Sequence, residues 1–155
     1  MAAAYARANY WAFLPDGVLF FRPWRPEPAP ARLHHQHKTQ GAALISASNP
    51  YSVKVSEDKN RAEQMRLRVE LEPYGPVYVT EGAAAGSGEK AERSFLVFGI
   101  ALEDALKLGR KYKQHAIVYT ELRRGVAIPQ LKACQLSQQK VFDTLRRSSD
   151  RKGRN

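Results

Sequence analysis

The sequence predicts an α+β fold: a two-layer sandwich with a mixed or largely antiparallel sheet and three to four helices. Strand-like runs and amphipathic helical segments interleave without a strict strand–helix–strand alternation, and hairpin signals occur at the start and in the middle of the chain. The 155 residues suit one compact domain, and a hydrophobic fraction of 43% is ordinary for a folded protein. We expect a single domain over residues 1–131, followed over 132–155 by a C-terminal helix and a basic, disordered tail.

The chain begins with a predicted hairpin. Residues 10–14 and 18–21 are rich in β-forming side chains, and the Pro-Asp-Gly sequence at 15–17 between them is typical of a turn. Four prolines within 23–30 exclude a helix or a central strand there, so we expect this arm to lie extended on the surface.

A short helix over about 31–38 and a buried strand over 42–46 come next. Ser56 is a suitable N-cap for a longer helix that runs to about Glu72, with two carboxylates in its first turn. We expect the inward face of that helix to carry three apolar side chains: Ala62, Met65 and Val69.

Strands at 77–80 and 94–98 flank a glycine-rich connection at 82–88. The second strand is continuously apolar after its first serine, which favours a central strand covered on both faces. The remaining predicted elements are a helix at about 102–113, strands at 116–119 and 126–128, and a last helix at about 136–147.

The positive charge is concentrated toward the C-terminus. The chain has a net charge of +10, and residues 132–155 hold seven basic and two acidic side chains. Such a cationic segment attracts polyanions, because each phosphate that it neutralises releases counterions. A second cationic group lies on one helix face, although its cations also complement the helix dipole. The predicted nucleic-acid-binding residues are Lys107, Arg110, Lys111, Arg146, Arg147, Arg151, Lys152 and Arg154, with Trp24 and Tyr51 as stacking surfaces if they are accessible.

A set of polar side chains flanks the ends of the predicted strands, where separate segments can meet in one cleft. The set is Asn49, Ser52, Asn60, Ser94 and Gln114. Hydroxyl and amide groups do not transfer protons at neutral pH, so we favour a structural role and name no catalytic residue. Glu92 and His115 are the nearest groups that can titrate.

Other sites are not indicated. His34, His35 and His37 do not have the spacing of metal ligands, and we expect exposed histidines near a helix end. We therefore expect no metal and no cofactor. The single cysteine, Cys134, fits a reducing, cytoplasmic compartment, and the absence of a long apolar run argues against a membrane partner.

Several of these segments together resemble the bacterial family called domain of unknown function 3293. The resemblance is carried by Ala47-Ser48-Asn49-Pro50-Tyr51-Ser52, Asn60, Ser94 through Ile100, Ala105 through Arg110 and Gln114 through Val118, and it covers roughly residues 9–121. Arg93 and His115 depart from the family pattern. The resemblance implies a small soluble protein without an assigned activity, and the basic end lies outside it.

The leading hypothesis is therefore a non-enzymatic binding module that contacts nucleic acid or a nucleoprotein complex. One alternative is a small enzyme or metabolite-binding protein that uses the polar cleft. Another is an adaptor whose proline-rich arm at 23–30 docks on a protein partner.

Overall fold

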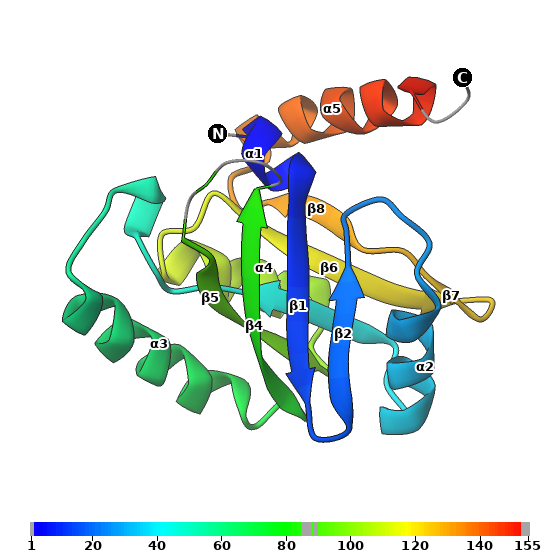
Figure 1. Ribbon diagram of the computed structural model, residues 1–155, viewed down its shortest axis with the longest axis horizontal. Coiled ribbons are helices and arrows are strands. Elements are labelled where there is room, and N and C mark those ends of the chain that lie inside the picture. The colour runs from blue at the N-terminus through cyan, green and yellow to red at the C-terminus, as the bar shows by residue number, and fades with distance from the viewer. Residues whose placement is uncertain (1, 85–87, 89, 153–155) are drawn as a thin grey trace.

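The computed structural model describes residues 2–84, 88 and 90–152, and it has the expected α+β class (Figure 1). The strands are β1 (Ala8–Leu14), β2 (Gly17–Phe21), β3 (Gly41–Ile45), β4 (Val77–Ala84), β5 (Glu92–Phe98), β6 (Ala116–Arg123), β7 (Val126–Ala127) and β8 (Gln130–Ala133). The helices are α1 (Ala2–Arg7), α2 (Pro28–His37), α3 (Glu57–Leu71), α4 (Leu102–Lys111) and α5 (Gln139–Lys152), with 3-10 turns η1 (Pro50–Ser52) and η2 (Leu136–Gln138).

The strands form one sheet in the order β2-β1-β4-β5-β3-β6-β7, with β8 also paired to β6. Each pairing found within the described ranges is antiparallel, which confirms the predicted antiparallel character. The predicted hairpin over residues 10–21 is the β1–β2 pair, with Leu14 opposite Gly17.

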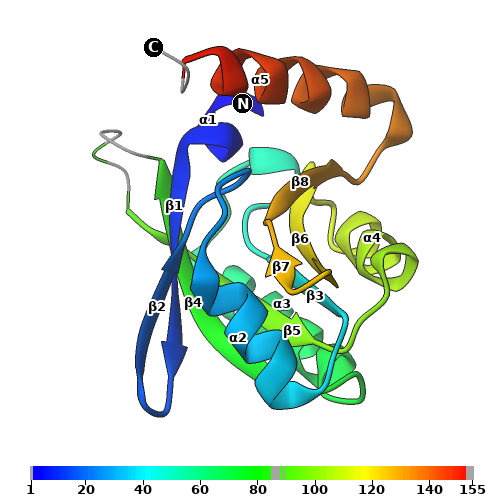
Figure 2. The same ribbon diagram turned by 90° about the vertical axis from the view of Figure 1, so that its right-hand side faces the viewer.

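The central strands are buried on both faces. Alternate residues of β5 enter different clusters: Leu96 and Phe98 join the side chains of α2 and α5, whereas Phe95 and Val97 join those of α3 and α4. The first cluster collects residues from both ends of the sheet, so the sheet curls around it (Figure 2). Residues 95–98 are therefore continuously apolar because the strand is covered on both faces, as predicted.

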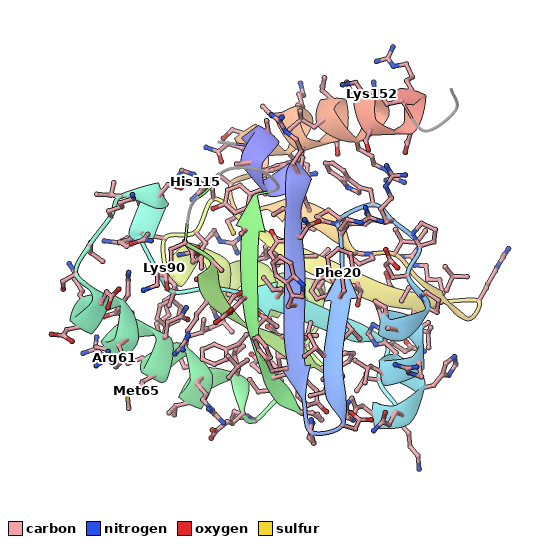
Figure 3. The ribbon with its side chains drawn as sticks, viewed as in Figure 1. Phe20, Arg61, Met65, Lys90, His115 and Lys152 are labelled. Carbon is pink, nitrogen blue, oxygen red and sulfur yellow. The ribbon has the colours of Figure 1, made fainter. Side chains whose placement is uncertain are left out.

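Helix α3 starts where the sequence places it, because the Ser56 hydroxyl accepts a hydrogen bond from the Lys59 amide at 3.2 Å. The expected inward face is wrong. Ala62 is exposed and Met65 and Val69 are each 66% exposed, and Figure 3 shows Met65 pointing away from the sheet. The buried face is instead Gln64, Leu67 and Leu71. The hydrophobicity of the side chains did not identify the buried face, because one of its three residues is the polar Gln64.

The C-terminal segment is part of the folded domain. Strand β8 pairs with β6, so the expected boundary at residue 131 falls inside the sheet. Phe142 of α5 is buried and meets Tyr5 of α1 edge-on at 6.5 Å between ring centroids, which places α1 and α5 side by side (Figures 1 and 2). Residues 148–152, expected in a disordered tail, continue α5, and residues 153–155 lie outside the described residues.

The proline-rich arm is tied to the body of the protein. The Trp24 amide donates to the Pro129 carbonyl at 2.6 Å, and the half-buried indole packs against the first core cluster. Helix α2 already begins at Pro28, because proline is tolerated in the first turn of a helix. Among the helices of the described ranges, each is too short or too polar to cross a bilayer.

Of the three histidines expected to be exposed, only His35 is exposed; His37 is half-buried and His34 is buried. Its ring is fully buried, and its nitrogens lie 2.7 Å from Thr120 Oγ1 and 3.2 Å from Thr39 Oγ1. Phe98 packs edge-on against it at 5.1 Å. Burial lowers the pKa of His34 to about 4, and a hydrogen bond to the Thr39 backbone only partly offsets this.

Gly99 should not tolerate a side chain. It has a φ of +95°, and a Cβ there would lie 2.6 Å from the Tyr74 carbonyl oxygen. We expect Gly99→Ala to lower the free energy of unfolding by about 3 kcal/mol, from both backbone strain and the clash. Gly125 has a φ of +77°, and an added Cβ there would have no atom within 4 Å. We therefore expect Gly125→Ala to lower the free energy of unfolding by only about 1 kcal/mol. Equal losses in urea unfolding would contradict this reading.

His34 should make stability pH-dependent. Because its folded-state pKa lies below its ordinary 6.5, the unfolded chain takes up this proton first. The contribution of neutral His34 to the free energy of unfolding is complete above pH 6.5. It is lost as the pH falls toward 4, by at most about 1.4 kcal/mol per pH unit.

Urea unfolding across this pH range tests the assignment. His34→Gln should be less stable than the native protein at pH 7, with a difference that shrinks toward pH 4. His35→Gln, an exposed change on the same helix, should follow the native curve. A His34→Gln difference that stays constant with pH would refute it.

Candidate functional site

The connection from β3 to α3, residues 46–55, is held by side-chain amides. We call it the β3–α3 loop. The Gln64 side chain accepts from the Ala47 amide at 3.1 Å and donates to Ser48 Oγ at 2.9 Å and Ser46 Oγ at 3.3 Å. Ser46 Oγ in turn donates to the Arg93 carbonyl at 3.0 Å, which ties the loop to the start of β5. These groups are buried or nearly so, and each bond therefore satisfies a polar group that water does not reach.

Two asparagines hold the next part of the loop. Asn60 Oδ1 accepts from the Asn49 amide at 2.8 Å, and Asn60 Nδ2 donates to Asn49 Oδ1 at 3.0 Å. Asn49 Oδ1 also accepts from the Val55 amide at 3.3 Å. Asn49, Tyr51 and Ser52 all have positive φ, at 46°, 50° and 61°. Such non-glycine backbone persists only where its surroundings fix it.

The end of α4 supplies a third fixing point. The Tyr51 amide donates to the Lys113 carbonyl at 2.7 Å, and Gln114 Nε2 donates to the Ser48 carbonyl at 3.0 Å. Lys113 itself has a φ of 55°. The loop is thus bonded to α3, β5 and the residues after α4.

The structure brings together part of the predicted polar set. Asn49, Asn60 and Gln114 all bind the β3–α3 loop, and the Ser52 amide donates to the Asn49 carbonyl at 2.8 Å. Ser94 lies elsewhere, with its hydroxyl 2.7 Å from Thr80 Oγ1 on the neighbouring strand. Sequence reasoning missed Ser46, Ser48 and Gln64. The four-residue spacing of Asn60 and Gln64, which puts both on one helix face, is the signal that identifies Gln64.

Two titratable groups border the loop. Asn49 Nδ2 donates to Glu92 Oε2 at 3.5 Å. Desolvation by the surrounding protein raises the pKa of Glu92, and hydrogen bonds from Ser46 and Asn49 partly offset that rise. Burial, together with the negative charge of Glu92, raises the pKa of Tyr5.

His115 and Cys134 complete this region without forming a catalytic pair. The Tyr51 ring lies 5.6 Å from the His115 ring, and His115 Nε2 is buried with no hydrogen-bond partner among the described residues. Figure 3 shows His115 near η1. Burial raises the pKa of the Cys134 thiol to about 12, so the thiolate needed for nucleophilic attack is scarce. The Cys134 amide donates to the His115 carbonyl at 2.9 Å. Among the described residues, no hydrogen bond joins the His115 side chain to the side chain of Glu92 or Cys134, so no base is placed beside the thiol.

A groove of about 620 Å³ lies between the β3–α3 loop, α3 and the end of α4. Its lining residues are Ala47, Pro50, Val55, Lys59, Asn60, Glu63, Arg66, Val69, Glu70, Lys111, Tyr112 and Lys113. The network described above therefore builds one wall of a hollow of ligand size.

The predicted cationic face of α4 is partly engaged in structural contacts. Lys111 forms an ion pair with Glu70 of α3, and Arg110 donates to the Cys134 carbonyl at 3.3 Å. Lys107 is exposed. Of the two proposed stacking side chains, Trp24 is half-buried in the core, whereas Tyr51 is 47% exposed.

The cations of α5 remain exposed. Lys140, Arg146, Arg147, Arg151 and Lys152 all face solvent, and Lys152 lies at the outer end of the helix (Figure 3). No ion pair involves any of these five within the described part of the chain, whereas all three arginines of α3 pair with acids. Arg154 lies outside the described residues.

Asn60 should control the mobility of the loop. Asn60→Ala leaves the Asn49 amide without its acceptor, which should lower the free energy of unfolding by about 1–3 kcal/mol and speed hydrogen exchange of the Asn49 and Val55 amides. Gln36→Ala, which removes an exposed amide from α2, should change neither quantity. Unchanged exchange in Asn60→Ala would show that the loop does not depend on this pair.

Comparison with known proteins supports one resemblance. Searches of curated proteins and of solved structures gave no match. The model of the family described as Protein of unknown function (DUF3293) matches residues 45–117, a shorter range than the expected 9–121. That range contains the β3–α3 loop and α4 and excludes α5. Over residues 45–117, the chain therefore resembles the DUF3293 family.

Proposed function

We propose that this protein binds nucleic acid, free or within a nucleoprotein complex, through the exposed face of α5. The observation that carries the proposal is the set of five α5 cations that lack an acidic partner among the described residues. An unpaired surface cation can bind a phosphate directly. A cation in an ion pair must first break the contact with its acidic partner.

The geometry of α5 supports contact with an extended polyanion. Lys140, Arg147 and Arg151 are spaced by seven and four residues, so they lie along one face of the helix. Phe142 is buried on the opposite face, with Leu145 half-buried beside it. A helix anchored on one side and cationic on the other can follow a phosphate backbone without moving from the protein body.

The α4 cations contribute less to this proposal. Lys111 and Arg110 already have protein partners, and α4 lies on a different side of the molecule from α5 (Figure 2). We infer that Lys107, Arg110 and Lys111 add to the overall positive field, and that direct phosphate contacts come from α5. A cytoplasmic location is part of this proposal, since a lone buried cysteine fits a reducing compartment.

Replacing the α5 cations should weaken binding and reduce its salt dependence. We expect the triple variant Lys140→Gln, Arg147→Gln, Arg151→Gln to bind single-stranded and duplex oligonucleotides at least about tenfold more weakly at low salt. The slope of log affinity against log salt should decrease by about 2 to 3, because roughly 0.9 counterions are released per phosphate contact. Fluorescence anisotropy across a salt series measures both quantities.

A charge-matched variant provides the control. Arg61, Arg66 and Arg68 lie on α3 and each pairs with an acid of that helix or its C-cap. Their combined replacement by Gln removes the same charge and should leave the slope unchanged. The proposal fails if the native protein does not bind at low salt, or if both triple variants lose affinity equally.

A further inference from the structure

We propose that the groove beside the β3–α3 loop binds a small organic anion that carries an apolar body. This site is separate from α5 and does not depend on nucleic-acid binding. Its volume of about 620 Å³ lies within the range of about 300–1,000 Å³ that is typical of small-molecule sites. Three further observations point to the charge and shape of the ligand.

The first observation is the charge left over inside the groove. Glu63 pairs with Arg66 at 2.9 Å, and Glu70 pairs with Lys111. The remaining charged lining residues are Lys59 and Lys113, and neither has an acidic partner in the part of the chain that the structure describes. They come from different walls, the first turn of α3 and the residues after α4. An anion in the groove would therefore meet two unpaired cations.

The second observation is the apolar lining between the charges. Val55, Val69 and Tyr112 contribute to the walls, and Val69 is 66% exposed to solvent. A simple inorganic anion would leave this surface in water. A ligand with an apolar body would cover it and gain about 25 cal/mol for each Å² removed from water.

The third observation is strained backbone at Lys113, which lines the groove, and at three residues of the β3–α3 loop around its lining residue Pro50. Among the described residues, seven non-glycine residues have positive φ, and Asn49, Tyr51, Ser52 and Lys113 are four of them. Strain of this kind gathers at binding sites and persists where surrounding contacts enforce it. The Asn60 and Gln64 amides enforce it here without a ligand, so the groove is formed before binding.

The position of the groove in the chain agrees with this reading. All its lining residues fall between 47 and 113, inside the family-matched range of 45–117. The cationic helix α5 lies outside that range. The family-like segment therefore contains a complete candidate site of its own.

Three matched probes test the charge and apolar requirements: 4-phenylbutyrate, 4-phenylbutanol and 4-phenylbutylamine. In amide NMR titrations of the full chain, 4-phenylbutyrate should shift groove signals saturably with a Kd below about 10 mM. The alcohol should bind at least threefold more weakly, and the amine should not bind there. Phenyl phosphate, titrated separately, shows whether carboxylate or phosphate is preferred.

A double substitution tests the two lysines. Lys59→Gln with Lys113→Gln should weaken 4-phenylbutyrate binding at least about fivefold. Lys38→Gln with Lys107→Gln is the matched control, because Lys38 also follows a helix at positive φ and Lys107 is an exposed helical lysine outside the groove. The control should keep the native affinity, and the amide spectra show directly that each variant is folded.

The proposal is overturned if none of the anions saturates the groove signals by about 10 mM. It is also overturned if the amine binds as tightly as the carboxylate, or if both double variants lose affinity equally. Oligonucleotide binding by the Lys59–Lys113 variant should be retained, which separates this site from the one proposed on α5.

Discussion

The arrangement of this protein depends on one constraint: the β3–α3 loop must hold a left-handed backbone without glycine. Asn49, Tyr51 and Ser52 have positive φ, and each such residue costs on the order of 1–2 kcal/mol. The Asn60 and Gln64 side chains offset that cost by satisfying the loop amides of Asn49 and Ala47. Because both side chains belong to α3, the same bonds fix the helix against the sheet.

This constraint explains how a helix with little apolar surface stays in place. Helix α3 contributes only Leu67 and Leu71 to the described core, and its outer face exposes Met65 and Val69. Its position is therefore set by polar bonds to the loop as much as by hydrophobic burial. The groove exists because α3 stands against the loop at its N-terminal end while the end of α4 closes the other side.

Most of the fold follows from local sequence signals, and the failures have physical causes. The apolar runs at 42–46 and 94–98 and the cap at Ser56 predict real elements, because strand burial and capping act over a few residues. The buried face of α3 could not be predicted from hydrophobicity, since Gln64 is buried for its hydrogen bonds. Helix α1 and the first turn of α5 pack through the contact of Tyr5 with Phe142, which joins segments from opposite ends of the sequence, so local signals do not predict it. In the polar set, Asn49 and Asn60 bond to each other and Gln114 bonds to the Ser48 carbonyl of the same loop, whereas the Ser94 hydroxyl bonds to Thr80 on the neighbouring strand.

The structure thus separates two surfaces, a cationic helix face and a groove with two unpaired lysines. The most direct test of this division is one amide NMR sample titrated first with an oligonucleotide and then with 4-phenylbutyrate. Our account predicts two disjoint sets of shifted signals, the first on α5 and the second around Lys59, Val69 and Lys113. Displacement of one ligand by the other, with the same signals responding to both, would contradict it.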